Sequence, residues 1–240
     1  ELLNNDILTL TKDDSYFNTE SNKSMMRFLN EYIRRLNETR DDGYYCFLTN
    51  NHDMPRTSFF YNKHELEIIY SFMFLMPGVP FLYYGDEIGM KFLNVPTKEG
   101  GYFRTGARTP MQWDNSKNLG FSKASKEDIY LPVDEDKNAP TVEKAKKDPN
   151  SLLYLFKKLI ELRNTYEDLG NVQNFELIDA SENRKFVIYK RGNFYFLLNP
   201  SMYDEKYNLD GNFEIIHQVG NIDINNHIIN KSSFAVLRKL

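Results

Sequence analysis

The sequence predicts an α/β region followed by a small antiparallel β domain, and three observations support this fold class. Helical and strand-like patterns alternate as far as about residue 168. Two short apolar runs in this part each end in a cluster of polar residues, as strands of an α/β protein do. After Gly170 only short β-prone runs follow. We therefore expect domains at residues 1–168 and 169–240, which together give enough chain for a full core.

Composition excludes several classes of function. The net charge is -4 and no basic stripe is present, so we expect no nucleic-acid partner. The longest apolar stretch, Ile68–Tyr84, is broken by prolines and a glycine, so we expect no membrane span. No signal-peptide pattern opens the sequence, and its single cysteine excludes an intrachain disulfide, which favours a cytoplasmic location. Because Cys46 lies inside an apolar run, we expect a buried structural thiol.

The first half of the chain reads as a helix followed by a strand–helix–strand unit. Apolar residues recur at helical spacing from about residue 22 to 36 and again, with little polar face, from 63 to 76. Apolar, aromatic-rich runs at 44–48 and 79–84 favour buried strands. A helix that connects two strands makes parallel pairing the default expectation.

Polar side chains follow both predicted strands. Asn51, His52, Asp53 and Arg56 follow the first, and Asp86 and Glu87 follow the second. The plainest interpretation is a polar turn that caps the next helix, with Asp86 and Glu87 holding loops and pairing with arginines. The alternative is a pair of carboxylates, Asp53 with Asp86 or Glu87, which is the arrangement that cleaves glycosidic bonds. No second His or Cys lies at ligand spacing from His52, so we expect neither a metal nor another cofactor.

The rest of the chain gives less information about chemistry. Residues 89–131 form a long irregular segment that contains Trp113. This segment either builds the rim of a site or packs on the barrel as a structural excursion, with Trp113 at the centre of its own small hydrophobic core. A charged, proline-containing crossing at 133–150 precedes a predicted helix at 152–163. The predicted strands of the β domain, which we interpret as a sandwich, are 175–178, 185–189, 194–198, 213–216 and 233–237.

Three segments resemble motifs of the α-amylase superfamily of glycoside hydrolases. Phe47–Arg56 resembles the motif on the family's seventh barrel strand, and Pro77–Met90 resembles its eighth-strand segment. Arg108–Asp114 is similar to a segment of members that act on short α-glucosides, such as oligo-1,6-glucosidases and trehalose synthases. The resemblance implies the C-terminal part of a (β/α)8 TIM barrel, with strands 7 and 8 and helices, followed by the family's β-sandwich.

The resemblance also implies roles for site residues. Asp53 matches the third family carboxylate, which is not the nucleophile but holds sugar hydroxyls and favours the charge-developing transition state. His52 would donate to sugar oxygens, and Arg56 would either pair locally or bind substrate. Asp86 and Glu87 match non-catalytic positions. The implied ligand is an α-linked gluco-oligosaccharide or disaccharide, cleaved with retention.

The family's nucleophile Asp and acid/base Glu lie on the fourth and fifth strands, and no segment here carries either motif. We therefore expect a C-terminal portion of a retaining α-glucoside-active hydrolase or transglycosylase that is inactive alone. Two alternatives stay open: a non-catalytic carbohydrate-binding or scaffold protein, and one chain of a split enzyme completed by the N-terminal half of the barrel. The sequence does not distinguish hydrolysis from transglycosylation or isomerisation.

Overall fold

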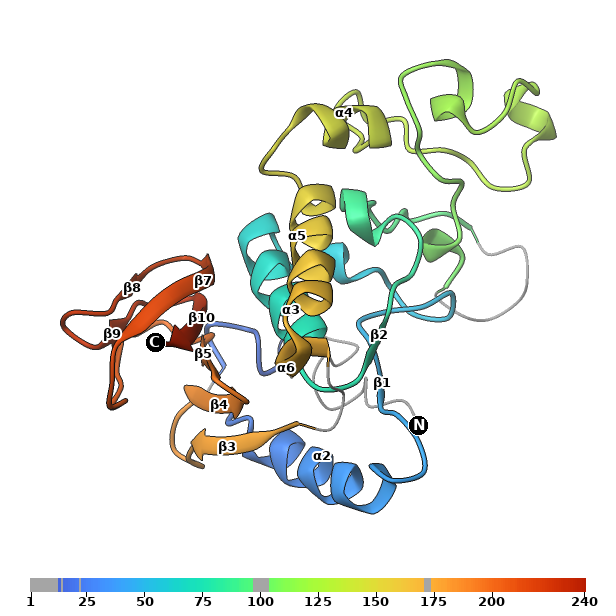
Figure 1. Cartoon of the computed structure of the whole chain (residues 1–240). Coiled ribbons are helices and arrows are strands. Elements are labelled where there is room, and N and C mark those ends of the chain that lie inside the picture. Colours follow the sequence, from blue (N-terminus) through green and yellow to red (C-terminus); the bar gives the residue numbers. More distant parts are fainter. Residues whose placement is uncertain (1–12, 14, 22, 97–103, 171–173) are drawn as a thin grey trace. The chain divides into compact units, whose positions relative to one another are not determined.

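The computed structural model describes residues 13, 15–21, 23–96, 104–170 and 174–240 (Figure 1). These residues form two compact units. The first, here called the sheet unit, contains the described residues up to Phe47, with His64–Pro80 and Leu159–Leu240. The second, here called the loop unit, contains Leu48–Lys63 and Phe81–Lys158. The expected domain boundary at residue 168 stays a prediction.

The predicted helices are present. They are α2 (Met26–Thr39), α3 (Lys63–Leu75) and α5 (Leu152–Thr165), with a short α6 (Glu167–Gly170) after them. In α2 the buried residues Phe28, Leu29, Tyr32 and Leu36 form one stripe, as the periodicity predicts. By contrast α3 is buried nearly all round, which agrees with its small polar face. The crossing at 133–150 contains one helix that the sequence did not indicate, α4 (Val142–Lys147), capped by Thr141.

Two short strands, β1 (Cys46–Leu48) and β2 (Val79–Phe81), form a two-stranded sheet. Next to it, Val79 N donates to Tyr45 O at 2.7 Å. Two expectations are wrong here. Cys46 is half-buried, because Tyr45 and Phe47 point into the core and alternation turns Cys46 the other way. The 79–84 run is not a buried strand, since Phe81 is 53% exposed.

The physical reason for this exposure is that a barrel strand is buried by neighbouring strands and by helices. Among the described residues, β1 and β2 pair with each other alone, and the barrel is not closed. The expected fold class is therefore confirmed in part: helices come first and antiparallel sheets follow, without a complete barrel.

Two arginines, one buried and one half-buried, hold the C-terminal end of α3 in the sheet unit. Arg191 is fully buried, and its Nη1 donates to Leu75 O at 2.7 Å. Arg163 donates to Phe74 O at 2.5 Å and to Gly78 O at 2.8 Å. The last carbonyls of a helix have no partner within the helix, so these guanidinium groups satisfy acceptors that burial would otherwise leave unpaired.

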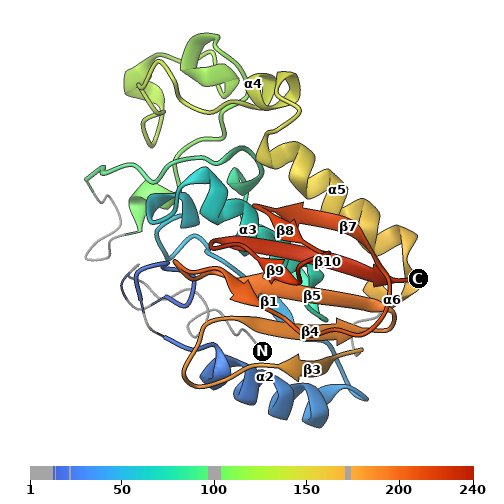
Figure 2. The same ribbon diagram turned by 90° about the vertical axis from the view of Figure 1, so that its left-hand side faces the viewer.

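The β domain contains two antiparallel sheets (Figures 1 and 2). The larger has the order β3-β4-β5-β10-β7, and the smaller has the order β6-β9-β8. The five longer strands are those that the sequence predicts, whereas β6, β8 and β9 are two residues each and too short to show a pattern. The bounds are β3 (Glu176–Asp179), β4 (Val187–Arg191), β5 (Phe194–Asn199), β6 (Glu205–Lys206), β7 (Phe213–Val219), β8 (Ile222–Asp223), β9 (Ile228–Ile229) and β10 (Ser233–Lys239).

The three central strands of the five-stranded sheet, β4, β5 and β10, are largely buried on both faces. Ile188 and Leu197 share one apolar core with Ile229 of the smaller sheet. On the opposite face Tyr189 stacks on a neighbouring ring at 4.5 Å between centroids and meets Phe72 of α3 edge-on at 6.2 Å. Burial on both faces explains why these strands read as continuous apolar runs rather than as alternating ones.

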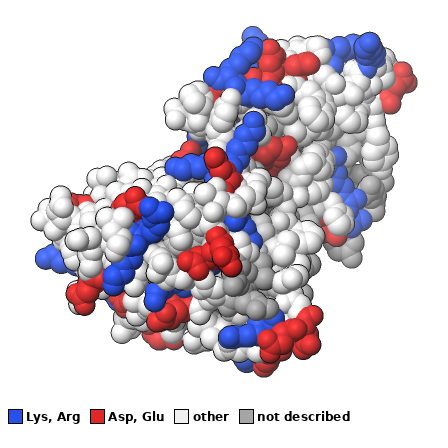
Figure 3. Space-filling view, viewed as in Figure 1, with Lys and Arg blue, Asp and Glu red and all other residues white. Residues whose placement is uncertain are grey.

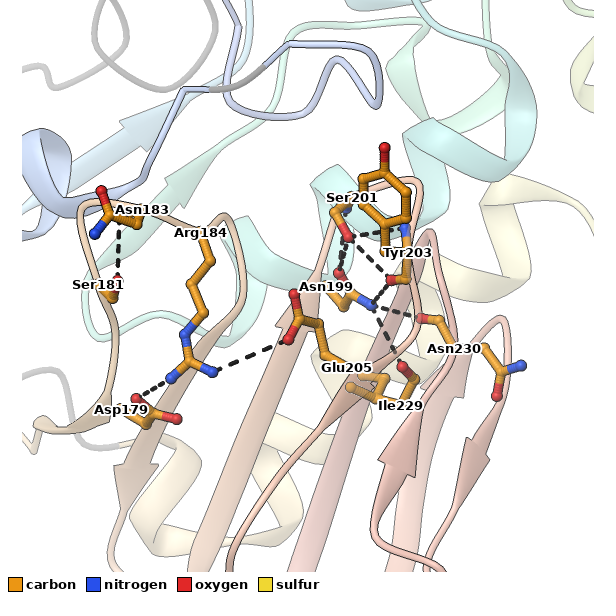
Figure 4. A network of polar contacts seen from close by, with 10 residues as sticks. All are labelled: Asp179, Ser181, Asn183, Arg184, Asn199, Ser201, Tyr203, Glu205, Ile229 and Asn230. Carbon is orange, nitrogen blue, oxygen red and sulfur yellow. Dashed lines mark hydrogen bonds and ion pairs between the residues drawn. The ribbon is translucent and has the colours of Figure 1, made fainter.

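A polar network joins the ends of these strands (Figure 4). The amide of Asn199, fully buried at the end of β5, donates to Tyr203 O at 2.8 Å and to Asn230 O at 2.9 Å. Its carbonyl accepts from the hydroxyl of Ser201 at 2.7 Å. Arg184 pairs with Asp179 nearby. Asn199 also donates to Ile229 O at 3.4 Å, and it thus ties β5 to the 201–203 turn and to β9 of the smaller sheet.

Candidate active site

The predicted site residues all lie in the loop unit, on three segments. The first follows β1 and carries residues 50–56, and the second follows β2 and carries residues 83–87. The third, residues 104–108, belongs to the long irregular segment. The structure therefore brings the polar ends of both strands together with part of that segment.

Two arginines hold the carboxylate of Asp53. Arg104 Nη1 and Arg108 Nη2 each donate to its Oδ1 at 2.8 Å. The backbone N–H of Asp53 donates to Asn51 Oδ1 at 2.8 Å, so the turn is closed on the other side as well. Arg108 also donates from Nε to His52 O at 2.8 Å. Both the backbone and the side chain of this turn are therefore fixed before any ligand arrives.

Asp53 is ionised in this setting. Desolvation acts to raise the pKa of Asp53, but hydrogen bonds from Arg104 and Arg108 and the charge of His52 outweigh it and hold that pKa below its ordinary value. His52 Nε2 lies 3.2 Å from Asp53 Oδ2. The two side chains are 63% and 49% exposed, so both face solvent. His52 and Asp53 therefore form an exposed pair, in which the imidazole can supply a donor and the carboxylate an acceptor.

Arg56 lies in the interior and is fully buried. Its Nη1 donates to Tyr84 O at 2.6 Å, and its Nη2 donates to Ala107 O at 2.9 Å. The guanidinium also lies over the rings of Tyr83 and Tyr84, at 4.9 and 4.8 Å from their centroids. These are local contacts, the first of the two roles expected for Arg56. Binding of substrate by Arg56 stays a prediction.

Asp86 is a buried carboxylate, and its amide partner is Asn50, for which the sequence predicts no role. Asn50 Nδ2 donates to both carboxylate oxygens, at 3.0 and 3.1 Å, and Arg56 Nη1 lies 3.9 Å from Asp86 Oδ1. Burial raises the pKa of Asp86 to about 7, although Asn50 and Arg56 act to lower it. Asn50 is polar at the end of an apolar run, and that contrast was the signal available in the sequence.

The contacts of Asp86 and Glu87 agree with the interpretation that these two acids hold loops in place. Asp86 is 3% exposed and engaged by Asn50, and Glu87 accepts from the backbone N–H of Gly85 at 2.8 Å. None of the contacts described here for Asp86 and Glu87 involves Asp53, so they do not support a catalytic pair of carboxylates. Arg104 and Arg108 were not singled out as site residues, because they lie more than 50 residues from Asp53 in the chain.

In the part of the chain that the structure describes, neither a metal site nor a membrane-spanning helix is found. No group of three or more His, Cys, Asp or Glu side chains in it is placed to hold a metal ion. None of its helices combines the length and apolar character needed to cross a bilayer. On the face shown in Figure 3, positive and negative side chains are interspersed among the described residues.

The geometry of the site and the order of its segments agree with a family comparison. Residues 7–171 match the model of the family described as "Alpha amylase, catalytic domain". The chain belongs to this family. The match extends over the helices, β1, β2 and the whole candidate site, and it confirms the resemblance drawn from the three sequence motifs.

Individual relatives agree with this assignment. The oligo-1,6-glucosidase of Parageobacillus thermoglucosidasius is 32% identical over 165 residues, which cover 54% of this chain and 29% of that protein. The amino acid transporter heavy chain SLC3A1 of Mus musculus is 33% identical over 121 residues, which cover 50% of this chain and 17% of the relative. The chain thus spans less than a third of the length of either relative.

A solved structure shows the same fold. The isomaltulose synthase from Erwinia rhapontici NX5 superposes with a TM-score of 0.72 at 19% identity, over 90% of this chain and 46% of that chain. At this identity the likeness concerns the fold alone. The protein described here corresponds to about half of that enzyme.

Proposed function

We propose that this chain supplies the C-terminal part of the catalytic apparatus of a retaining α-glucoside-active glycoside hydrolase or transglycosylase. The observation that carries the proposal is the state of Asp53: ionised, half exposed and held by two arginines at the position where the family motif has its third carboxylate. The substrate would be an α-linked gluco-oligosaccharide or disaccharide. The name of the related oligo-1,6-glucosidase supports this class.

The electrostatics of Asp53 suit a stabilising role better than the other two catalytic roles. A general acid needs a raised pKa, and the pKa of Asp53 is lowered. A nucleophile needs a carboxylate free to form a bond, and Oδ1 of Asp53 accepts from two guanidinium groups. An ionised acceptor in a fixed position can bind sugar hydroxyls, and those hydrogen bonds strengthen as positive charge develops on the sugar ring.

The chemistry then requires two further carboxylates, a nucleophile and an acid/base, on either side of the scissile bond. We propose that both come from the half of the barrel that this sequence does not contain, either in a longer chain or in a second one. Exposed apolar residues on and after β2 support this proposal. Phe81, Leu82 and Tyr84 are 53%, 42% and 38% exposed, and a closed barrel would cover such side chains.

Reconstitution tests the proposal. The chain alone is expected to give no turnover of isomaltose or of an aryl α-glucoside. Co-expression with the N-terminal barrel half of the related oligo-1,6-glucosidase should restore turnover, and Asp53→Asn in the restored complex should lower kcat by about 10²–10³-fold. Turnover by the chain alone, or a restored complex indifferent to Asp53→Asn, would overturn it.

A second candidate is a non-catalytic carbohydrate-binding or scaffold protein. The observation in its favour is that a relative is named as an amino acid transporter heavy chain, so this sequence family also occurs in proteins named for another task. This candidate predicts saturable binding of isomaltotriose in calorimetry, weakened only modestly by Asp53→Ala. Absence of any heat of binding would dispose of it.

A further inference from the structure

Trp113, the single tryptophan of the sequence, is 49% exposed in the loop unit. From the sequence, Trp113 could either form the centre of a local hydrophobic core or belong to the rim of a site, and half exposure of its side chain excludes the core. A large aromatic ring that remains open to solvent in a fixed position is suited to stack against a flat apolar face of a ligand. Trp113 takes no part in the contacts around Asp53.

The backbone around Trp113 is held on both sides. Its N–H donates to Leu119 O at 2.8 Å, and its carbonyl accepts from Glu143 N at 2.9 Å. Three consecutive residues then adopt left-handed conformations: Asn118 and Leu119, with φ of 54° and 53°, and Gly120, with φ of 76°. Leucine seldom adopts this conformation, so the surroundings must impose it, and such backbone is concentrated at binding sites.

Asn118 provides part of that constraint. Its amide is buried and donates to Ser122 O and to Ala124 O, each at 2.9 Å. The loop from Trp113 to Ala124 is therefore closed by its own hydrogen bonds. A stacking surface presented on such a loop loses little conformational entropy when a ligand binds.

The exposed ring borders a hollow of about 550 Å³, which is within the size range of small-molecule sites. Its lining combines the indole and the apolar Val142 with the polar side chains of Asp114, Asn115, Ser116, Glu143 and Lys146. Hydrogen bonds from Ser116 hold the pKa of Asp114 below its ordinary value, so this side chain is an ionised acceptor. The acceptors Asp114 and Glu143 and the amide of Asn115 suit a ligand rich in hydroxyl groups.

We infer that this hollow is an accessory binding site for a neutral oligosaccharide, which stacks a sugar ring on Trp113 and directs hydroxyls to Asp114, Asn115 and Glu143. A sugar has one apolar ring face and many hydroxyls, and it matches an aromatic surface bordered by carboxylates and an amide. The choice of α-linked glucose units as the ligand rests on the proposed function. The location of the site does not.

Because Trp113 is the single tryptophan, its fluorescence reports on this hollow directly. Titration of the chain with isomaltotriose should change the emission saturably, with a midpoint in the millimolar range, whereas glycerol at equal concentration should not. Asp53→Ala should leave the titration unchanged, which separates this site from the candidate active site. Tyr130→Ala is the matched control, because this aromatic residue is also exposed and does not line the hollow.

Trp113→Ala removes the fluorophore, so its effect is measured by saturation-transfer NMR on the trisaccharide. Binding at the accessory site should weaken by at least about tenfold, as expected when a central aromatic anchor is truncated. Asp53→Ala and Tyr130→Ala should each keep the signal. No saturation at tens of millimolar isomaltotriose, an unchanged signal in Trp113→Ala, or a fluorescence response lost in Asp53→Ala would each overturn the inference.

Discussion

Asp86→Asn should change the stability of this protein in a way that depends on pH. Asp86 is 3% exposed, and burial raises its pKa to about 7, whereas an aspartate in an unfolded chain titrates near its ordinary value. The folded state therefore binds the proton more tightly than the unfolded state does. The contribution of Asp86 is most favourable below the unfolded pKa and is lost as pH rises through about 7.

The magnitude follows from the two pKa values. A shift of about three units corresponds to a ceiling of about 4 kcal/mol, of which about 2.5 kcal/mol is lost between pH 5 and pH 8. Asparagine cannot ionise, so Asp86→Asn removes this dependence. It should be more stable relative to the wild type at pH 8 than at pH 5, by about 2–3 kcal/mol. Urea unfolding monitored by circular dichroism at both pH values measures the difference.

Asn50→Ala provides the opposite test. Its Nδ2 donates to both oxygens of Asp86, and hydrogen bonds favour the charged form, so their loss should cost more at pH 8 than at pH 5. The reasoning fails if the difference between Asp86→Asn and the wild type is the same at both pH values. In that case Arg56, 3.9 Å away, would be compensating the buried charge fully.

Two further predictions concern the backbone near β2 and the arginines around Asp53. Gly78 has φ of +146°, and a Cβ there would lie 2.5 Å from the ring of Phe47, so Gly78→Ala should lower the unfolding free energy by about 2 kcal/mol or more. Gly43→Ala, where a Cβ meets nothing within 4 Å, should change it by less than about 0.5 kcal/mol in the same urea experiment. Arg108→Ala should raise the pKa of Asp53 toward its ordinary value in a carboxyl-carbon NMR titration, whereas Arg34→Ala, whose partners are Glu31 and Glu38, should leave it unchanged. An Asp53 titration indifferent to Arg108→Ala would show that the ion pair does not persist in solution.

Local patterns were sufficient for the longer regular elements, but not for the short helix α4. The helix from 63 to 76 and the strands at 185–189 and 194–198 each carry a pattern within a few residues, and the structure has α3, β4 and β5 at those places. The two-residue strands β6, β8 and β9 carry no pattern, because their pairing depends on a turn and on the sheet beside them. The burial expected for Cys46 and for the 79–84 run was wrong for a related reason. Burial depends on which other elements pack against a segment, and the local sequence does not contain that information.

For the candidate site, the sequence by itself determined which residues we predict to carry the chemistry. Asp53, His52 and Arg56 follow from one motif at a strand end, and the family match bears out that motif's origin. The tertiary structure decided the surroundings of each residue. Arg104 and Arg108 reach Asp53 from a distant segment and keep it ionised, and Arg56 is withdrawn into the interior beside Asp86. Charge and burial are set by contacts between distant parts of the chain, and for that reason residue identity could be read from the sequence while protonation and accessibility could not.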